Sequence, residues 1–335
     1  SFPAFFLAVF PLIAPGQELV WEDYILAICH PLQQMADGAG TRLIINAPPR
    51  TLKSSIVSNV YAAWRLGRDP ALKIVVVSYN NDLAIRLTRD FRTIIESSLY
   101  RRLFPWMEIS PRKNTETEIA TTLNGGRFAT SFGGSLTGHG GDLLIIDDPM
   151  KPGEAASSVT MEKVLEDYRS TLSTRLNTPG RSQTIVVMQR IHEMDLSGYL
   201  SAQGGFETLV LPAIFPETRK VNLGTRIRTY RKGDLLSPAR LTRQFLDGQR
   251  AIMGPRRSTS RTRCQPAAIP SGRSGSGSMM PASHPTATGK GSSAGIRRQS
   301  PAKAMITAQV PSGASQPTIP TTFSTSCMAS GNSRS

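Results

Sequence analysis

Residues 42–54 read RLIINAPPRTLKS and join an apolar run to a turn that holds two prolines. Residues 54–64 follow with apolar side chains at helical spacing. The stretch therefore predicts a buried strand, a tight loop and a helix that opens at Lys53 and Ser54. Strand, loop, Lys-Ser and helix in this order are the layout of a nucleotide phosphate-binding loop.

Such a loop holds phosphates with backbone N–H groups and with the N-terminus of its helix. We expect the side chain of Lys53 to reach the β- and γ-phosphates of ATP and the Ser54 hydroxyl to ligate Mg²⁺. The residues expected to bind the nucleotide are Ala47, Pro48, Pro49, Arg50, Thr51, Leu52, Lys53 and Ser54.

Two residues depart from the usual G-x-x-x-x-G-K-[ST] pattern. Ala47 and Leu52 stand where the glycines belong. Glycine is normal there because the backbone approaches phosphate closely or adopts a positive φ. Ala is a mild change and Leu a larger one, so this stretch alone fits an ordinary strand-turn-helix equally well.

A second apolar run, residues 143–146, ends in two adjacent carboxylates, Asp147 and Asp148. Alone it could be a strand that ends in a turn. A phosphate-loop ATPase needs one Asp at a strand end to hold Mg²⁺ and a neighbouring acid to orient or deprotonate the attacking water. We assign the metal to Asp147, with Ser54, and the water to Asp148. The carboxyl ends of parallel strands share one edge, so these acids and Lys53 can converge.

A third apolar run, residues 184–188, ends in Gln189 and Arg190. A polar side chain at the tip of a neighbouring strand can sense the γ-phosphate, and an Arg can stabilise transition-state charge. Arg50, Arg175 and Arg190 compete for that role, and we favour Arg50 and Arg190. His139 lies in a Gly-rich loop, where it could touch nucleotide or DNA, although a histidine without a ligand role is the commoner case.

Strand-like and helix-like segments alternate through most of the chain, which predicts an α/β fold of the P-loop NTPase type. We expect a mostly parallel sheet with helices on both faces and one β-hairpin that turns at residues 124–126. The expected parts are a helical lead-in at residues 1–40, an ATPase domain at 41–253 and a low-complexity basic tail at 254–335. The other expected elements are strands at 73–79 and 206–211, and helices at 17–35, 54–64, 81–97, 161–176, 195–202 and within 234–253.

The formal charge of +15 favours a polyanionic partner, with nucleic acid first. Ten of the 39 Lys and Arg residues and none of the 24 Asp and Glu residues lie within 255–335, so the rest of the chain is only modestly basic. The three cysteines have no metal-binding spacing, and a reducing cytoplasm is expected. The apolar residues 2–14 are too short to span a bilayer, so no membrane partner is expected.

Past residue 254 the periodic pattern stops. About two thirds of the remaining residues are Ser, Thr, Pro, Gly or Ala. Such a composition cannot build a core, and we expect the tail to be disordered.

Three stretches together resemble the large terminase subunit of tailed bacteriophages, the motor that packages DNA into a procapsid. They are residues 42–54, 134–149 and 187–196. The last resembles the coupling segment of that family, which links hydrolysis to domain motion. The phosphate loop of the family often lacks the standard glycines and carries an extra Arg, so Arg50 and Leu52 fit the resemblance.

The resemblance covers about residues 15–253. It implies ATP hydrolysis with Mg²⁺ and translocation of double-stranded DNA, which is gripped through its phosphates. It also implies a portal protein and a small terminase subunit as partners, a ring homo-oligomer, and a phage- or prophage-encoded protein in the cytoplasm of a bacterium.

The chain departs from this family at its C-terminal end. Family members usually carry a nuclease domain that cuts DNA with metal ions held by Asp and Glu. No carboxylate side chain follows Asp247, so two-metal cleavage has no ligands here. The abrupt change in composition suggests a frameshift near codon 254, and the other two reading frames of the gene would test this hypothesis.

Three alternatives stay open. The chain could be a helicase or other translocase of the same class, although a helicase needs a second motor domain. It could be an inactive prophage remnant. It could also be a basic DNA-binding protein driven by its tail.

Overall fold

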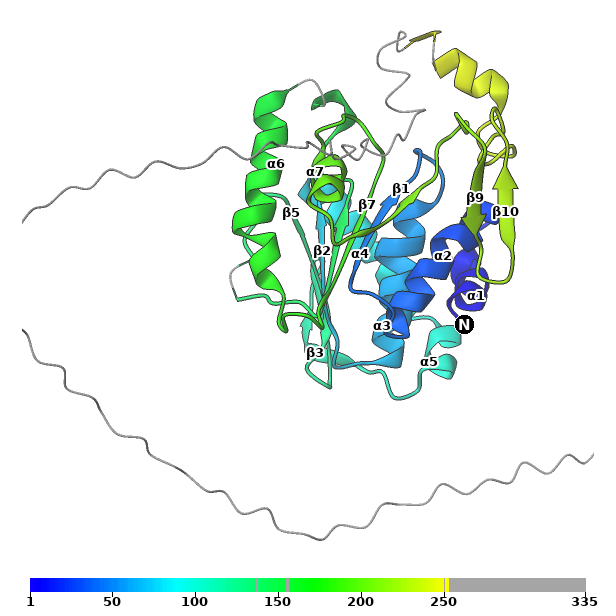
Figure 1. The fold of residues 1–335 in the computed structure, drawn as a ribbon. Coiled ribbons are helices and arrows are strands. Elements are labelled where there is room, and N and C mark those ends of the chain that lie inside the picture. Colours follow the sequence, from blue (N-terminus) through cyan, green and yellow to red (C-terminus); the bar gives the residue numbers. More distant parts are fainter. Residues whose placement is uncertain (137, 155–156, 250, 253–335) are drawn as a thin grey trace, which may run out of the picture. The chain divides into compact units, whose positions relative to one another are not determined.

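An eight-stranded sheet forms the centre of the fold in the computed structural model (Figure 1). The structure describes residues 1–136, 138–154, 157–249 and 251–252, so the tail predicted at 254–335 lies outside the described residues. The strand order is β3-β4-β5-β2-β6-β7-β1-β8. The strands are β1 (Arg42–Asn46), β2 (Lys73–Ser78), β3 (Ile109–Asn114), β4 (Glu118–Thr121), β5 (Gly126–Ser131), β6 (Leu143–Asp147), β7 (Gln183–Met188) and β8 (Glu207–Val210).

Every strand pair from β5 to β8 is parallel, which confirms the mostly parallel sheet. The pairs β3–β4 and β4–β5 of this sheet are antiparallel, and β4 with β5 forms the predicted hairpin. The acidic strand β6 lies two places from the phosphate-loop strand β1, with β7 between them. The ends of β1, β6 and β7 therefore share one edge of the sheet.

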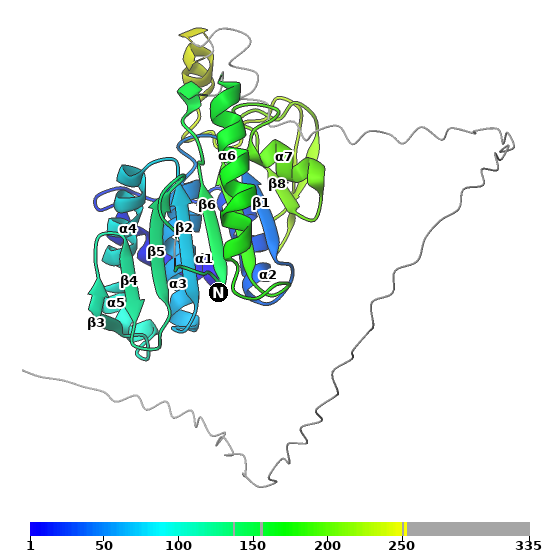
Figure 2. The ribbon, with the colours of Figure 1, turned by 90° about the vertical axis from the view of Figure 1, so that its left-hand side faces the viewer.

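Helices from the N-terminal part of the chain cover one face of the sheet (Figures 1 and 2). Their apolar side chains form a large core with β1, β2 and β6. The lead-in expected at residues 1–40 shares this core, since Phe2 of the first helix contacts Tyr61 and Trp64. The elements are α1 (Phe2–Ile13), α2 (Asp23–Ala36), the π-helix η1 (Ser55–Tyr61), α3 (Ala62–Arg68), α4 (Asn81–Ile95) and α5 (Ser98–Leu103).

The opposite face carries α6 (Ser158–Ser170) and α7 (Leu196–Gln203), which Figure 2 shows in front of the sheet. They pack on the outward side chains of β1, β2, β6 and β7 in a second core. The sheet is thus covered on both faces, as the alternation of elements predicts. The short helices η2 (Pro152–Glu154) and η3 (Leu172–Arg175) flank α6.

The structure differs from the sequence prediction in several places. α5 and β3 were not predicted, and the helix predicted at 17–35 begins at Asp23. Residues 55–61 form a π-helix before α3, instead of one α-helix over 54–64. The helix predicted at 161–176 is α6, which starts three residues earlier and ends at Ser170, followed by η3. A small antiparallel sheet of β9 (Arg219–Asn222) and β10 (Ile227–Tyr230) was not predicted, because these strands are short and mostly polar.

The last segment is helical at residues 243–249, within the range predicted. No helix in the described part of the chain is both long and apolar enough to cross a membrane.

Candidate phosphate-binding site

The loop after β1 turns sharply at two residues with positive φ. Arg50 has φ 65° and Leu52 has φ 57°. Leu52 stands at the second glycine place of the pattern, so the chain keeps a glycine-like conformation there without glycine. The hydroxyl of Thr51 closes the loop by donating to the carbonyl of Pro48 at 2.7 Å. Within the described residues, the N–H groups of Arg50, Thr51 and Leu52 donate to no acceptor, so they are free to bind an anion.

Lys53 and Asp148 form an ion pair at the edge of the sheet. The Lys53 Nζ lies 2.8 Å from Oδ2 of Asp148, and these side chains are 8% and 20% exposed. Asp148 is also fixed by its neighbour strand, because its Oδ1 accepts from the N–H of Gln189 at 3.0 Å and its own N–H donates to Val187. Its φ of 43° turns the chain at the end of β6.

Asp147 is fully buried beside this pair, and its carboxylate accepts hydrogen bonds from two hydroxyl groups. Ser54 donates to its Oδ1 at 2.9 Å, and Ser58 donates to its Oδ2 at 2.6 Å. Burial raises the pKa of Asp147 to about 6, the charge of Asp148 adds to this, and Lys53 and the two hydroxyls partly oppose it. A cation at this carboxylate would favour its charged form.

The hydroxyl of Ser58 is the part of the site that sequence reasoning missed. Ser58 lies on η1 and is itself fully buried. Its spacing of four residues from Ser54, one helical turn further along, is the signal that could have found it. A π-turn is often found at functional sites, and here it carries one donor to Asp147, Ser58, while the other donor, Ser54, directly precedes it.

The three candidate arginines lie in different surroundings. The Arg190 guanidinium is buried and pairs with Asp195, with Nε 3.1 Å from Oδ1, and it donates to the carbonyls of His192 and Glu193. Arg175 lies beside Gly141, which precedes the start of β6, at the end away from Asp147. Arg50 is exposed on the phosphate loop itself.

The guanidinium carbon of Arg50 lies 5.4 Å from the ring centroid of Phe245 in the last helical segment. Arg50 thus belongs to the loop by its backbone and contacts that segment by its side chain.

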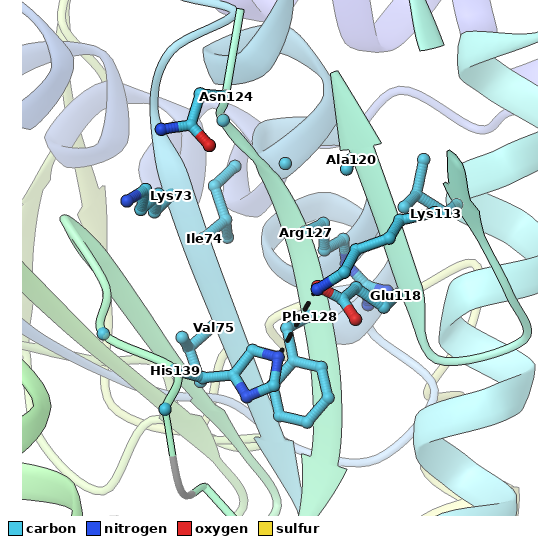
Figure 3. A pocket seen from close by; sticks show the side chains of 15 residues that line it. Lys73, Ile74, Val75, Lys113, Glu118, Ala120, Asn124, Arg127, Phe128 and His139 are labelled. Carbon is cyan, nitrogen blue, oxygen red and sulfur yellow. Dashed lines mark hydrogen bonds and ion pairs between the residues drawn. The ribbon is translucent and has the colours of Figure 1, made fainter. Parts of the chain in front are cut away.

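His139 is not part of this site. It stacks on Phe128 at a centroid distance of 3.8 Å and lies 3.5 Å from Glu118 (Figure 3). These residues line a cavity of about 420 Å³ that also borders Lys73, the first residue of β2. The cavity includes none of the predicted nucleotide-binding residues.

The donor set at Asp147 fits Mg²⁺. A carboxylate and a Ser hydroxyl are hard oxygen ligands, and Mg²⁺ is usually held by one or two carboxylates together with substrate phosphates. In the described ranges, no cluster of three or more His, Cys, Asp or Glu side chains could hold a metal without such phosphates. Ser54 and Asp147 therefore suit a metal that arrives with a nucleotide.

The fold and the site define an α/β protein of the P-loop NTPase type, with the loop after β1 and the acid pair after β6 at one sheet edge. No family model matches the chain. The chain is 27% identical over 236 residues to the large terminase subunit of Enterobacteria phage T3. It is therefore similar to a phage large terminase subunit over about two thirds of its own length. The match covers 66% of this chain but only 36% of the relative, so the chain spans little more than a third of that protein.

Two solved structures are also similar. The large terminase of HK97 bacteriophage is 17% identical with a TM-score of 0.41, over 60% of this chain and 41% of that one. The large terminase ATPase domain of Thermus phage P74-26 is 14% identical with a TM-score of 0.47, over 76% of this chain and 96% of that one. Both TM-scores are below 0.5.

Proposed function

We propose that this chain is the ATP-hydrolysing motor domain of a DNA-packaging terminase. The observation that carries the proposal is the meeting of Lys53 and Ser54 with Asp148 and Asp147 at one edge of the sheet. The relation to a phage large terminase supports the same activity. Bound Mg²⁺ would neutralise phosphate charge and polarise the reacting phosphoryl group.

Each residue of the site has a distinct part in this proposal. Ser54 and Asp147 hold the metal, and the free N–H groups of the loop bind the phosphates. Lys53 exchanges its ion pair with Asp148 for the β- and γ-phosphates. Asp148, then released from the ammonium but still fixed by Gln189, orients or deprotonates the attacking water.

Arg50 is the better placed of the two arginines that we favour for transition-state charge. It is exposed on the loop, and among the described residues its guanidinium has only a ring contact, to Phe245, to release before it moves. Arg190 would have to break a buried ion pair and two carbonyl contacts.

The proposal extends to the whole assembly. Hydrolysis drives double-stranded DNA into a procapsid, with the protein working as a ring on a portal and receiving DNA from a small terminase subunit in the bacterial cytoplasm. The family's nuclease activity is proposed to be absent from this chain, because no carboxylate follows Asp247. Truncation at Gly254 tests the role of the basic tail: unchanged DNA affinity would exclude a protein that binds DNA through its tail alone.

ATP hydrolysis by the full chain and by Lys53→Ala tests the proposal. Lys73→Ala is the matched control, because Lys73 is exposed at the start of β2. We expect the wild type and Lys73→Ala to hydrolyse ATP at similar rates and Lys53→Ala to lose at least about 100-fold, as for removal of a main charge-stabilising group. A wild-type rate equal to that of Lys53→Ala would favour the inactive remnant.

A further inference from the structure

A buried arginine lies in β5, two places from the acidic strand β6 in the sheet, and has no part in the proposed function. Arg127 in β5 is 1% exposed. Ala129, two residues along the strand, packs in the core that η1 and α4 share, whereas Phe128 packs on the second core. Figure 3 shows Phe128 with His139 on that other side of β5. Arg127 therefore points into the layer between the sheet and the helices η1 and α4.

The polar atoms of Arg127 are only partly satisfied. Its Nη1 donates to Oγ1 of Thr88 at 2.7 Å, and its guanidinium carbon lies 4.9 Å from the ring centroid of Phe91. Its Nε and Nη2 have no acceptor within the part of the chain that the structure describes. Unpaired donors of a buried cation are destabilising, and an apolar side chain would be as stable there or more so. Packing alone therefore does not explain an arginine at this place.

Other polar groups lie in the same layer. Ser78 is the register partner of Asp147, so both side chains point to this face. Asn59 follows Ser58 on η1 and donates to Asp90 of α4 at 3.2 Å. The Oγ of Ser78 and the Oδ1 of Asn59 are buried and, like two nitrogens of Arg127, have no partner among the described residues.

The donors and acceptors of these groups can be joined by bridging water. Arg127 offers donors, Asn59 offers an acceptor and Ser78 offers both, beside the carboxylate of Asp147. Buried waters typically make about three hydrogen bonds to otherwise unsatisfied groups of this kind. Electrostatic attraction to Asp147 and Asp90 also favours the charged form of Arg127, and its pKa, lowered by burial to about 9, leaves it charged at neutral pH.

We propose that Arg127 is a positioning residue for the metal site, which holds the carboxylate of Asp147 from within the layer between the sheet and the helices η1 and α4, through buried water shared with Ser78 and Asn59. This inference rests on the proposed function. Among the described residues, the hydrogen bonds to the Asp147 carboxylate come from the neutral hydroxyls of Ser54 and Ser58, and Lys53 is bonded to Asp148. In this proposal Arg127 adds a cationic partner, reached through water, from the same layer.

Calorimetric titration of the full chain with ATP at pH 8, once with Mg²⁺ and once with EDTA, tests this role. The readout is the ratio of the two affinities, because a loosened fold would lower both affinities and leave their ratio unchanged. For Arg127→Met we expect this ratio to fall about 10- to 100-fold, as for loss of an outer-shell partner of a metal ligand. Arg127→Lys, which keeps a cation, is expected to retain most of the ratio.

Arg65→Met is the matched control. Arg65 bonds to Tyr61 and to Gln183, which starts β7 at the sheet edge opposite Asp147, so we expect the ratio to be unchanged. Direct repulsion between Arg127 and the metal would instead raise the ratio in Arg127→Met. A raised or unchanged ratio overturns the inference.

If Arg127→Met does not fold, the affinity ratios of Arg127→Gln and Arg127→Lys are compared instead, which again sets an uncharged against a charged side chain. A wild-type chain that binds no ATP overturns the proposed function and this inference with it. ATP binding by the wild type with equal ratios in all Arg127 variants overturns this inference alone.

Discussion

The ammonium of Lys53 lies 2.8 Å from the Oδ2 of Asp148, although 95 positions separate the two residues in the chain. The pair joins the phosphate loop to the end of the acidic strand, and Ser54 makes the same connection to Asp147. The loop and the strand end are therefore held together by two side-chain contacts.

Ser58→Ala should destabilise the protein although Ser58 is far from the surface of the site. The substitution removes a 2.6 Å hydrogen bond to a buried carboxylate. The expected loss at neutral pH is about 1.5–3 kcal/mol in the free energy of unfolding, the usual range for hydrogen bonds to charged groups. Urea denaturation measures it. Ser55→Ala, on the same π-helix but only partly buried, is the control, and equal losses in the two variants would refute a special role for Ser58.

Leu52→Ile should destabilise the protein, although leucine and isoleucine have the same side-chain volume. The φ of 57° at this position disfavours a β-branched side chain, and we expect a loss of about 1–2 kcal/mol in stability. Leu209→Ile in β8 is the control, since Leu209 is also partly buried against the same core but lies in a strand, where β-branching is favourable. Equal denaturation midpoints for the two variants would show that the loop does not hold this conformation.

The stability of the metal-free protein should depend on pH through Asp147. Its pKa is raised to about 6 in the folded state, so between about pH 4 and pH 6 the folded protein keeps a proton that the unfolded chain releases. Asp147 thus favours the folded state at low pH, and this contribution is lost as the pH rises through 6. Asp147→Asn mimics the protonated form and should not show the loss.

Unfolding in EDTA from pH 4.5 to 7.5 checks this prediction. The stability of the wild type relative to Asp147→Asn should decrease with rising pH and level off above about pH 7. A difference that is constant over this range would mean that Asp147 titrates normally in the folded protein.

Arg50 and Arg190 should separate into a functional and a structural residue. Arg50→Ala is expected to keep the stability of the wild type, because its side chain is exposed and its ring contact is weak, and to lower ATP turnover by at least about tenfold. Arg190→Met leaves the buried Asp195 without its counter-charge and should cost about 3–5 kcal/mol in stability. Thermal melting and turnover of both variants, measured together, would reveal a reversed assignment.

The convergence of Lys53 with Asp147 and Asp148 could be predicted because it follows from a general rule: parallel strands end at one edge. The hairpin around Asn124 could be predicted for a similar reason, since its turn chemistry is local. The π-helix could not, because the 3.6-residue pattern that predicts an α-helix does not register the long-range bond from Ser58 to Asp147.

The surroundings of Arg190 and Arg127 could not be predicted from the sequence either. Arg190 pairs with Asp195, only five positions away, yet the pattern there reads equally well as a free strand tip. Arg127 lies in a short hairpin strand where a charged residue normally points to solvent, and only the sheet order places it beneath α4. Contacts between elements decide both cases.

Equilibrium binding of ATP, with and without Mg²⁺, to the wild type, Lys53→Ala and Ser54→Ala tests the central claim most directly. If one nucleotide lies between the loop and the acid pair, Lys53→Ala should lose affinity in both conditions, whereas Ser54→Ala should lose only the gain that Mg²⁺ provides. Affinities of both variants equal to those of the wild type would contradict a phosphate site at this edge of the sheet.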